Sequence, residues 1–347
     1  MSQHETYIKR CFELAAKGLG ATAPNPLVGC VIANNNGIIG EGYHHKSGEA
    51  HAEVNAISSV VNKELLKESI IYVNLEPCSH FGKTPPCTDL IIQSGIPEVV
   101  IANNDPFAEV NGKGIELLRN AGCKVTTGIC EEEGSFLNRR FFTFHNQKRP
   151  YIILKWAQTL DGFMDIDGCE PGTNINNWIT NDKLKVLVHK WRTEESAVMV
   201  GAGTALNDNP RLTAREWPGR NPVRILIDEK NELPPTLHLF DNTVLTLVFT
   251  ANAAENRKNL EYIQADFRDD VIIQVLTELY NRNIQSVIVE GGRQLLDGFI
   301  SKNLWNEARV LTGNKYFHKG LKAPLINIRA GEIHAFDNDT YSLYINH

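Results

Sequence analysis

Strand-length apolar runs alternate with helix-length amphipathic runs along the chain, and this alternation restricts the fold more than any other feature. Two apolar runs, 27–33 and 37–43, flank Asn34-Asn35-Asn36-Gly37, which predicts a β-hairpin closed by an Asn-Gly turn. Residues 7–15 show helical spacing of apolar positions before it. After it we expect strands at 70–76, 98–102 and 123–128, and helices in the run from His51, at 88–95 and at 112–122. This order predicts an α/β domain with three layers, α/β/α, around a largely parallel or mixed sheet.

The pattern changes around residues 131–150, where a helical or connecting stretch precedes a new strand at 151–157. A second α/β series follows, with strands expected at 196–201, 222–228, 243–250, 270–276, 285–290 and 341–346. A chain of 347 residues has room for two domains of about 150 residues each. We therefore expect one domain at 1–146 and a second at 147–347.

Charge and cysteine usage restrict the partners and the compartment. The chain has 35 Lys and Arg against 41 Asp and Glu, a net charge of −6, which argues against broad electrostatic capture of nucleic acid or of an anionic membrane. No run approaches the roughly 18 apolar residues of a membrane span, and the N-terminus lacks an apolar signal core. Seven cysteines without disulfide-dense spacing indicate a reducing compartment. We expect a cytoplasmic protein with no nucleic-acid or membrane partner.

One set of residues has the composition of a catalytic zinc site. His51 is followed later in the chain by Cys78 and Cys87. One imidazole and two thiolates suit Zn²⁺, and three protein ligands leave a fourth position for water. Zinc lowers the pKa of a bound water toward ~7, which makes hydroxide available at neutral pH. We expect one zinc ion per chain at these three residues.

Glu53 completes this pattern as the expected proton shuttle. Residues two positions apart do not share a helix face, so Glu53 should contact the water and the substrate rather than the metal bound at His51. His-x-Glu followed by Pro-Cys-x-x-Cys is the signature of zinc nucleobase deaminases. This chain departs from it because eight residues separate Cys78 from Cys87. Cys87 also opens a helix-like run, whose N-terminus favours its thiolate.

Other readings of the same residues remain open at this point. A lone His-Ala-Glu is common by chance, and buried cysteines usually only pack. A structural zinc site would need a fourth protein ligand, for which His44 or His80 is the candidate. A nucleic-acid-editing deaminase would also carry zinc, but the acidic balance and the lack of a basic aromatic stripe count against it.

The second half contains two glycine-rich turns but no complete dinucleotide fingerprint. Gly201-Ala202-Gly203-Thr204 follows a strand-like run, but the third glycine of the fingerprint is missing. Glu290-Gly291-Gly292 ends another strand-like run and precedes a helical one. Such turns can present backbone N–H groups to a phosphate, and they can equally be tight turns that need glycine.

Longer motifs connect both halves to a known family. The first half contains APNPLVGCV (23–31), GYH (42–44), GEAHAE (48–53) and EPCSHFGKTPPC (76–87). The second contains KWAQTLDG (155–162), WIT (178–180), VGAGT (200–204), DNPRLTAR (208–215) and EGG (290–292). In content and order these motifs resemble the bifunctional RibD family of riboflavin-biosynthesis proteins, over residues 5 to about 320. The long spacing between the cysteines is that family's version of the motif, which favours it over tRNA-adenosine and cytidine deaminases.

The resemblance implies a fold and an activity for each half. The N-terminal domain would have the cytidine-deaminase-like fold and hydrolytically deaminate 2,5-diamino-6-(5-phosphoribosylamino)pyrimidin-4(3H)-one to 5-amino-6-(5-phosphoribosylamino)uracil. The C-terminal domain would be a dihydrofolate-reductase-like α/β domain that reduces the ribosyl to the ribityl side chain with NADPH. Joined domains of this family often assemble further, so a homo-oligomer is also an expectation.

The resemblance also assigns residues. It gives zinc to His51, Cys78 and Cys87 and the proton shuttle to Glu53. Substrate contacts in the deaminase half fall on Asn25, His44, His80, Lys83 and Asp105. In the reductase half, the residues facing substrate would be Lys155, Asn176, Arg192, Leu212, Arg215 and Glu290. NADPH would be held by Ala157, Trp178, Thr204, Asp208, Gly292, Arg293, Gln294, Leu295, Leu296, Asp297 and Gly298.

The second half departs from the family pattern at two places. Phe163-Met164-Asp165 replaces the usual small or basic residues, and Asn176 stands where the family usually shows Ser. These departures keep an alternative open, in which the protein is a deaminase only and carries an inactive reductase-like second domain.

Overall fold

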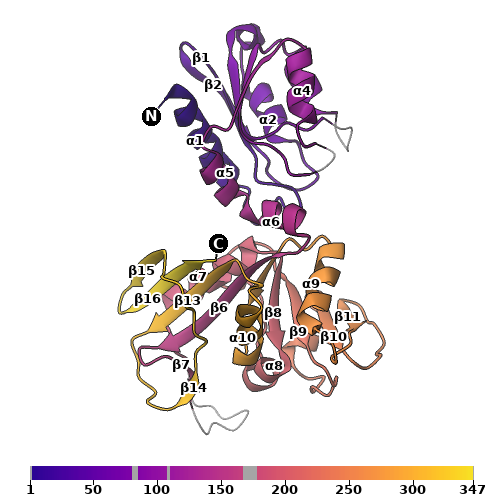
Figure 1. Cartoon of the computed structure of the whole chain (residues 1–347), viewed down its shortest axis with the longest axis vertical. Helices are drawn as coiled ribbons and strands as arrows, with labels where there is room; N and C mark the ends of the chain where they lie inside the picture. Colours follow the sequence, from indigo (N-terminus) through magenta and orange to yellow (C-terminus); the bar gives the residue numbers. More distant parts are fainter. Residues whose placement is uncertain (1, 80–84, 108–109, 167–177, 347) are drawn as a thin grey trace. The chain divides into compact units, whose positions relative to one another are not determined.

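The computed structural model describes residues 2–79, 85–107, 110–166 and 178–346. The chain divides into two compact units, Met1–Lys148 and Arg149–His347, each with its own sheet (Figure 1). This division lies two residues beyond the boundary expected after residue 146. Within the described parts of the chain, no helix is both long enough and apolar enough to cross a bilayer.

The N-terminal unit contains a five-stranded sheet in the order β2-β1-β3-β4-β5. Its strands are β1 (Gly29–Asn34), β2 (Gly37–Tyr43), β3 (Ile70–Leu75), β4 (Glu98–Asn103) and β5 (Lys124–Thr127). The strands β1 and β2 form the expected antiparallel hairpin, β1 also pairs antiparallel with β3, and the β3-β4-β5 portion is parallel. The helices are α1 (Gln3–Ala16), α2 (Ala52–Ser59), α3 (Cys87–Gln93), α4 (Lys113–Asn120), α5 (Glu131–Leu137) and α6 (Arg139–Gln147), with a 3₁₀ turn η1 (Lys63–Glu68).

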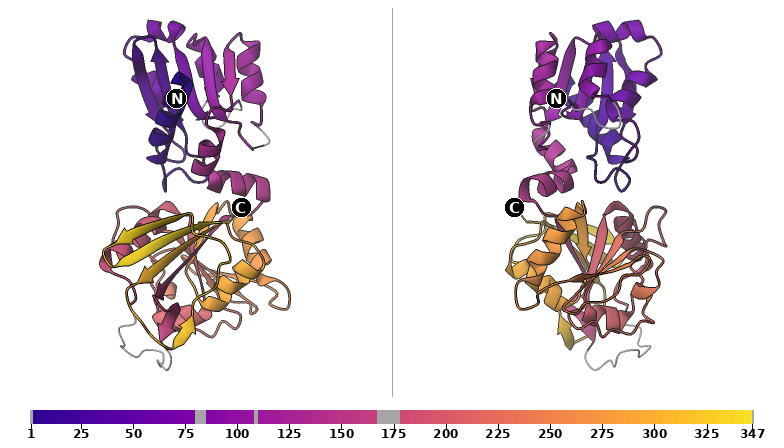
Figure 2. Two further views of the ribbon diagram at one scale, coloured as in Figure 1. Left: turned by 60° about the vertical axis from the view of Figure 1, so that its left-hand side comes forward. Right: turned by 90° about the vertical axis from the view of Figure 1, so that its right-hand side faces the viewer.

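Alternation along the strands divides the apolar side chains between two faces, and helices cover both (Figure 2). Cys30 and Ile32 of β1 belong to the core cluster that includes residues of α2, α3 and α4. Val31 and Ala33 belong to the opposite cluster, which includes residues of α1. The unit is therefore the predicted three-layer α/β/α arrangement.

The contact between α2 and β2 depends on two glycines. A Cβ at Gly42 would lie 2.4 Å from Ala56 N, and one at Gly40 would lie 2.7 Å from Ala56 O. Both distances are too short for real side chains, so glycine lets the helix backbone approach the strand directly. This packing fixes the start of α2, where His51 and Glu53 lie.

The C-terminal unit contains a nine-stranded sheet in the order β11-β10-β9-β8-β12-β6-β13-β16-β15. Its strands are β6 (Tyr151–Thr159), β8 (Ala197–Gly201), β9 (Val223–Ile227), β10 (Thr246–Thr250), β11 (Leu260–Gln264), β12 (Ser286–Val289), β13 (Glu307–Gly313), β15 (Glu332–Phe336) and β16 (Asp339–Ile345). From β11 to β13 all neighbours are parallel, and β13, β16 and β15 pair antiparallel. Two further strands, β7 (Phe163–Ile166) and β14 (Gly320–Lys322), pair with each other.

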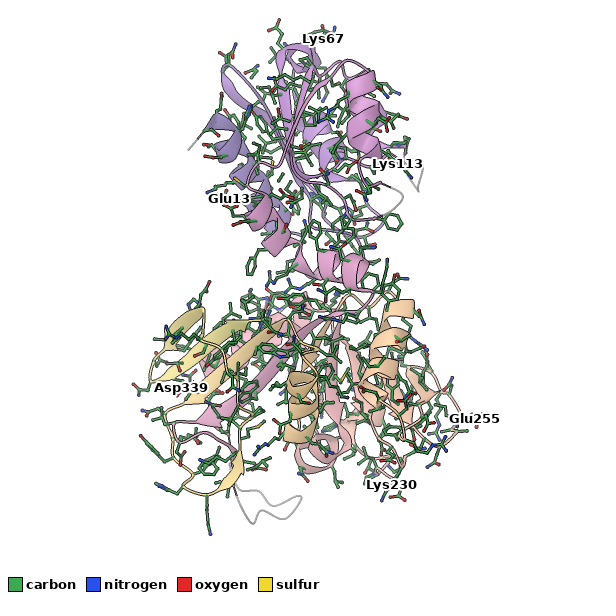
Figure 3. The ribbon with its side chains drawn as sticks, viewed as in Figure 1. Glu13, Lys67, Lys113, Lys230, Glu255 and Asp339 are labelled. Carbon is green, nitrogen blue, oxygen red and sulfur yellow. The ribbon has the colours of Figure 1, made fainter. Side chains whose placement is uncertain are left out.

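Helices also cover both faces of this second sheet. They are α7 (Asp182–Glu194), α8 (Ala202–Asp208), α9 (Val271–Asn281) and α10 (Arg293–Ser301), with a 3₁₀ turn η2 (His238–Phe240). One core cluster joins the sheet to α9 and α10, and the other joins it to α7 and α8. Apolar side chains fill these layers, whereas charged side chains such as Lys230 and Glu255 are exposed outside them (Figure 3).

One predicted strand is wrong. Residues 270–276 begin the helix α9, and the Asp270 carboxylate caps it by accepting hydrogen bonds from the N–H groups of Ile272 and Ile273. The buried residues recur at helical spacing, at Ile272, Val275, Leu276 and Leu279. The β-branched residues favoured a strand, but the N-cap and the 3.6-residue periodicity determine the structure. The strands β7, β11, β13, β14 and β15 were not expected.

Candidate active sites

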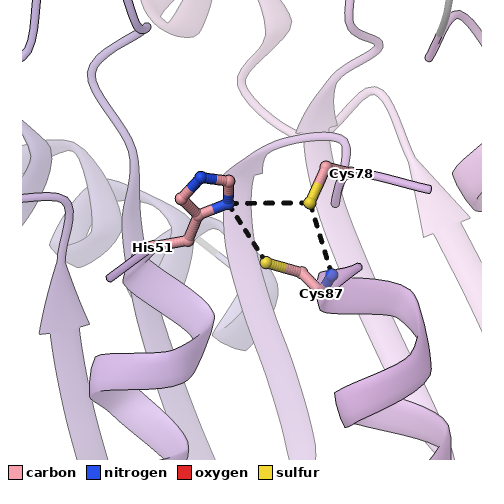
Figure 4. A group of neighbouring side chains, drawn as sticks. All are labelled: His51, Cys78 and Cys87. Atoms are coloured by element: carbon pink, nitrogen blue, oxygen red, sulfur yellow. Dashed lines mark hydrogen bonds between the residues drawn. The ribbon is translucent and has the colours of Figure 1, made fainter. Parts of the chain in front are cut away.

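His51, Cys78 and Cys87 meet from three different elements (Figure 4). His51 is the N-cap of α2, Cys78 lies just beyond β3, and Cys87 is the first residue of α3. The Nδ1 atom of His51 lies 3.6 Å from Cys78 Sγ and 3.3 Å from Cys87 Sγ. A tetrahedral zinc ion places a nitrogen and a sulfur ligand about 3.5 Å apart. The three donors therefore fit zinc and leave one coordination position for water.

The thiol of Cys78 ionises more readily than the thiol of Cys87. Contact with the Cys87 thiol, assisted by the His51 imidazole, lowers the pKa of Cys78 to about 4. The Cys87 backbone N–H also donates a hydrogen bond to the Cys78 sulfur at 3.3 Å. Contact with Cys78 and burial raise the pKa of Cys87. The pair thus holds one negative charge readily, and a divalent cation would stabilise the second thiolate.

Glu53 lies in the first turn of α2 and is buried, with 3% of its surface exposed. Burial, followed by the charge of Cys78, raises its pKa. His51 has extended backbone angles, φ −72° and ψ 165°, because it precedes the helix rather than belonging to it. The two-residue spacing between His51 and Glu53 therefore does not place their side chains on different faces of one helix. Both side chains reach the same site. A carboxylate that takes up a proton easily suits acid–base work.

His44 is held in one neutral tautomer. Its Nδ1 lies 3.0 Å from the carbonyl oxygen of Ala50, and its Nε2 lies 3.1 Å from Asn25 Nδ2. Nδ1 must donate to the carbonyl, so Nε2 accepts from the Asn25 amide. Burial lowers the pKa of His44, in agreement with this assignment.

This arrangement bears on the structural-zinc reading. Both ring nitrogens of His44 are occupied, so His44 is not a fourth ligand. In the described part of the chain, the group of side chains that could hold a metal ion consists of His51, Cys78 and Cys87. His80, the other candidate for a fourth ligand, and Lys83 lie outside the described residues.

Asp105 follows β4 and is buried near the metal ligands. Burial, together with the charges of Glu76 and Cys78, raises its pKa to about 6. Its carboxylate accepts a hydrogen bond from the Phe107 N–H at 2.8 Å. Asn25 contacts His44, the His44 ring lies against the His51 ring, and the charge of Cys78 acts on Asp105. The structure thus connects these three residues with the region of His51 and Cys78.

In the C-terminal unit, three charged residues form a buried cluster. Glu290 follows β12 and accepts hydrogen bonds from Nε and Nη2 of Arg192, both at 2.7 Å. The Lys155 ammonium, on β6, lies 3.5 Å from the same carboxylate. Burial alone would raise the pKa of Glu290, but the two cations lower it to about 2. The structure therefore brings together three residues that the resemblance assigned to the substrate.

Basic residues extend this cluster along one face of α7. Lys185, His189 and Arg192 follow each other at helical spacing. Burial and the charges of Arg192 and Arg215 lower the pKa of His189 to about 4. His189 was not predicted from the sequence, although its spacing to Arg192 was a usable signal. Arg215 itself is half exposed, with its Nε 3.8 Å from Glu216.

The two glycine-rich turns lie side by side because β8 and β12 are neighbours in the sheet. The N–H of Gly201 donates to the carbonyl oxygen of Gly291 at 3.1 Å. A Cβ at Gly292 would lie 3.0 Å from Thr204 Oγ1, whereas space beside Gly201 and Gly203 is open. The backbone of the Gly201–Gly203 turn is thus open to an approaching ligand, which fits the phosphates of a dinucleotide.

The other residues assigned to the cofactor and substrate vary in accessibility. Trp178 and Asp208 are exposed, and Ala157 is partly buried on β6. Leu212 and Leu296 are buried in the core, so their side chains face other apolar residues. Asn176 lies outside the described residues.

Two family models match the two units. Residues 1–103 match the cytidine and deoxycytidylate deaminase zinc-binding region, and residues 150–317 match the RibD C-terminal domain. The fold and the site thus define a deaminase-type zinc unit joined to a RibD C-terminal unit. These matches confirm the expected order of the two folds.

Similar proteins cover almost the whole chain. The riboflavin biosynthesis protein RibD of Aquifex aeolicus is 40% identical over 94% of this chain and 92% of its own length. The Thermotoga maritima diaminohydroxyphosphoribosylaminopyrimidine deaminase/5-amino-6-(5-phosphoribosylamino)uracil reductase is 39% identical, with a TM-score of 0.88 over 98% of this chain and 97% of that one. Acinetobacter baumannii RibD is 28% identical, with a TM-score of 0.88 over 99% and 98% of the chains. The chain belongs to the RibD family of riboflavin biosynthesis proteins.

Proposed function

We propose that this protein catalyses two successive reactions in riboflavin biosynthesis. The N-terminal unit deaminates 2,5-diamino-6-(5-phosphoribosylamino)pyrimidin-4(3H)-one to 5-amino-6-(5-phosphoribosylamino)uracil, and the C-terminal unit reduces the ribosyl chain to ribityl with NADPH. The observation that carries this proposal is the buried Glu53 beside His51, Cys78 and Cys87. Family membership connects that site to this substrate.

The chemistry of the deaminase follows from the roles of its side chains. His51, Cys78 and Cys87 would hold Zn²⁺, which supplies the Lewis acidity that lowers the pKa of a water ligand toward ~7. Glu53 takes a proton from the attacking water and delivers it to the ring nitrogen beside the carbon that bears the 2-amino group. It then transfers a proton to the departing amino group, so water is consumed and ammonia leaves as the carbonyl forms.

The substrate contacts rest on the orientation of three described residues. His44 accepts from Asn25 Nδ2, which leaves the amide oxygen of Asn25 free to accept from the pyrimidine. Asp105 faces the same region with a raised pKa, so it can accept from or donate to the amide edge of the ring. The family motif assigns His80 and Lys83 to the ribose phosphate, where an imidazole and an ammonium would donate to its oxygens.

In the reductase, the buried cluster of Lys155, Arg192 and Glu290 indicates different roles for Arg192 and Arg215. Arg192 is engaged with Glu290 through Nε and Nη2 and with the Thr213 carbonyl oxygen through Nη1. We therefore assign the substrate phosphate chiefly to Arg215, with Arg192 as the residue that orients Glu290. Glu290 and Lys155 then face the sugar chain. The low pKa of Glu290 keeps it ionised, so it accepts hydrogen bonds from the sugar hydroxyls.

NADPH would lie across the paired glycine-rich turns and supplies the hydride when bound. Thr204 and the start of α10 are close together at this edge of the sheet. Within 292–298, the residues 292–294 would contribute backbone N–H groups, because those of Leu295 and Leu296 already donate to the Gly292 carbonyl oxygen. Leu296 also turns its side chain into the core. Ala157, Trp178 and Asp208 complete the proposed cofactor contacts.

The test is one reaction that contains the full-length zinc-loaded protein, NADPH and the diaminopyrimidinone ribosyl phosphate. Ammonia release and NADPH oxidation are followed together. Matched release and oxidation support both activities on this chain. Ammonia release without NADPH oxidation, also with the deaminated uracil as substrate, would leave a deaminase with an inactive second unit.

The proposal also includes the compartment, the partners and the oligomeric state of the enzyme. We assign it to the cytoplasm because its cysteine usage indicates a reducing compartment. Its acidic net charge favours a small-molecule substrate, with neither nucleic acid nor membrane as a partner. Assembly into a homo-oligomer is tested by light scattering of the purified protein.

A further inference from the structure

Glu76 connects three parts of the deaminase unit through its backbone and its carboxylate. It is the first residue beyond β3 and is 4% exposed. Its N–H donates to the carbonyl oxygen of Asn103, at the end of β4, at 2.9 Å. Its carboxylate accepts hydrogen bonds from four backbone N–H groups at 2.9–3.3 Å, those of Asp105, Gly112, Gly114 and Ile115.

This carboxylate caps α4 from outside the helix. The helix has Gly112 as its own N-cap, with no side chain to accept from the first turn. Glu76 supplies the acceptor instead, and a negative charge at this end is favoured by the helix dipole. A Cβ at Gly114 would lie 2.3 Å from the carbonyl oxygen of Pro77, so the segment after β3 lies directly against the helix start.

The two groups that Glu76 connects belong to opposite sides of the proposed site. Cys78, a proposed zinc ligand, lies two residues beyond Glu76 on the same segment. Asp105, a proposed substrate contact, has its own N–H bound to Glu76 Oε2 at 3.3 Å. Any change in the reach or in the acceptor capacity of this side chain therefore changes the separation between the metal ligands and Asp105.

We propose that Glu76 is a positioning residue for the deaminase, which holds Asp105 and the start of α4 in register with the segment that carries Cys78. The proposal rests on the deaminase function given above. Glu76 acts on the placement of substrate against the metal, and not on the metal itself, because its carboxylate is fully used by backbone donors of the 105–115 segment.

The test compares Glu76→Gln with Glu116→Gln in the full-length protein. Gln keeps the shape of the side chain but presents an NH₂ group to N–H donors, which cannot pair with it. Glu116 is an exposed carboxylate in the first turn of the same helix, so its variant is a matched loss of charge. We expect Glu76→Gln to keep its zinc and to lose roughly 10- to 100-fold in deaminase kcat/KM, mainly through KM. Glu116→Gln stays within twofold of the wild type.

A double-mutant cycle with Asp105→Asn identifies the route of the effect. If Glu76 acts through Asp105, the double variant loses no more than the more impaired single variant. Multiplicative losses would overturn the proposal, and so would a Glu76→Gln loss that is fully explained by missing zinc. A Glu76→Gln protein as active as Glu116→Gln would also overturn it.

Two internal controls distinguish a loss of positioning by Glu76 from misfolding and from an error in the proposed function. NADPH oxidation with the deaminated substrate reports on the C-terminal unit, and ammonia release by the wild type reports on the deaminase function itself. If Glu76→Gln does not fold, Glu76→Asp replaces it, because it keeps the charge and shortens the reach by one methylene. The same KM increase and the same non-additivity with Asp105→Asn are then required.

Discussion

Arg192 and Glu290 form a bidentate pair in which Nε and Nη2 of the guanidinium each lie 2.7 Å from a carboxylate oxygen. Both side chains are nearly buried, with 10% and 6% exposed. The Lys155 ammonium lies 3.5 Å from Glu290 Oε2, the oxygen that Arg192 Nη2 also contacts. A buried carboxylate between two cations connects the stability of the C-terminal unit to pH.

Glu290→Gln should destabilise the C-terminal unit at pH 7 by on the order of 3 kcal/mol, because Arg192 and Lys155 lose their partner. The pKa of Glu290 is about 2 when folded and 4.5 in its ordinary state. Its contribution is therefore fully present above pH 4.5 and is lost as the pH falls towards 2. Scanning calorimetry of the variant should show a deficit that shrinks over this interval. The exposed Glu255→Gln is the control (Figure 3), and a deficit that does not depend on pH would contradict the prediction.

Arg215→Ala should raise the KM of the reductase for its phosphorylated substrate by roughly 10- to 100-fold with little change in kcat, because a charge-assisted contact to phosphate is lost. Arg268, which is 92% exposed and paired with Asp266, provides a control Arg→Ala variant. Steady-state NADPH oxidation measures both constants. With a dephosphorylated substrate the two variants should behave alike, and an equal defect on both substrates would assign Arg215 another role.

Glu53→Gln should reduce ammonia release by about 10²- to 10⁴-fold, the usual contribution of a general acid–base group. The variant should keep its zinc, because Glu53 is outside the metal-ligating group of the described residues. It should also oxidise NADPH at the wild-type rate with the deaminated uracil. Zinc content by mass spectrometry and an ammonia assay decide the matter, and full ammonia release would refute the proton-shuttle role.

Removal of zinc with a chelator should abolish ammonia release and spare NADPH oxidation with the deaminated substrate. Cys78→Ser should give the same separation permanently, because it removes the thiolate with the lower pKa of the pair. Added zinc should restore the chelated wild type and not the variant. Restoration of both proteins to the same activity would show that Cys78 is not a ligand.

Local patterns in the sequence predicted the parts of the structure that depend on neighbouring residues. The Asn-Gly hairpin is such a part, since Gly37 starts β2 with φ +108°. The convergence of His51, Cys78 and Cys87 was also predictable, because each belongs to a short motif with a specific chemistry. The strand predicted at 270–276 was wrong because two local signals conflict there. The β-branched residues favour a strand, whereas the N-cap at Asp270 starts a helix.

Long-range partners account for what could not be predicted. Glu76 binds backbone N–H groups 29 to 39 residues away, and backbone groups leave no signature in a sequence. The pairing of Arg192 with Glu290 spans 98 residues and depends on the placement of α7 beside β12. The sequence motifs included both residues, but their mutual contact required the fold.

Cys78 and Cys87 are each anchored by a different element, one by the end of β3 and the other by the start of α3. The distance between the sulfur atoms is therefore set by where β3 ends and α3 begins, and not by the number of residues between the two cysteines. Insertions and deletions can therefore accumulate in that connection during evolution while the metal site stays intact. Searches that require a fixed Cys-x-x-Cys interval will overlook enzymes of this kind, whereas searches for the two anchoring elements will find them.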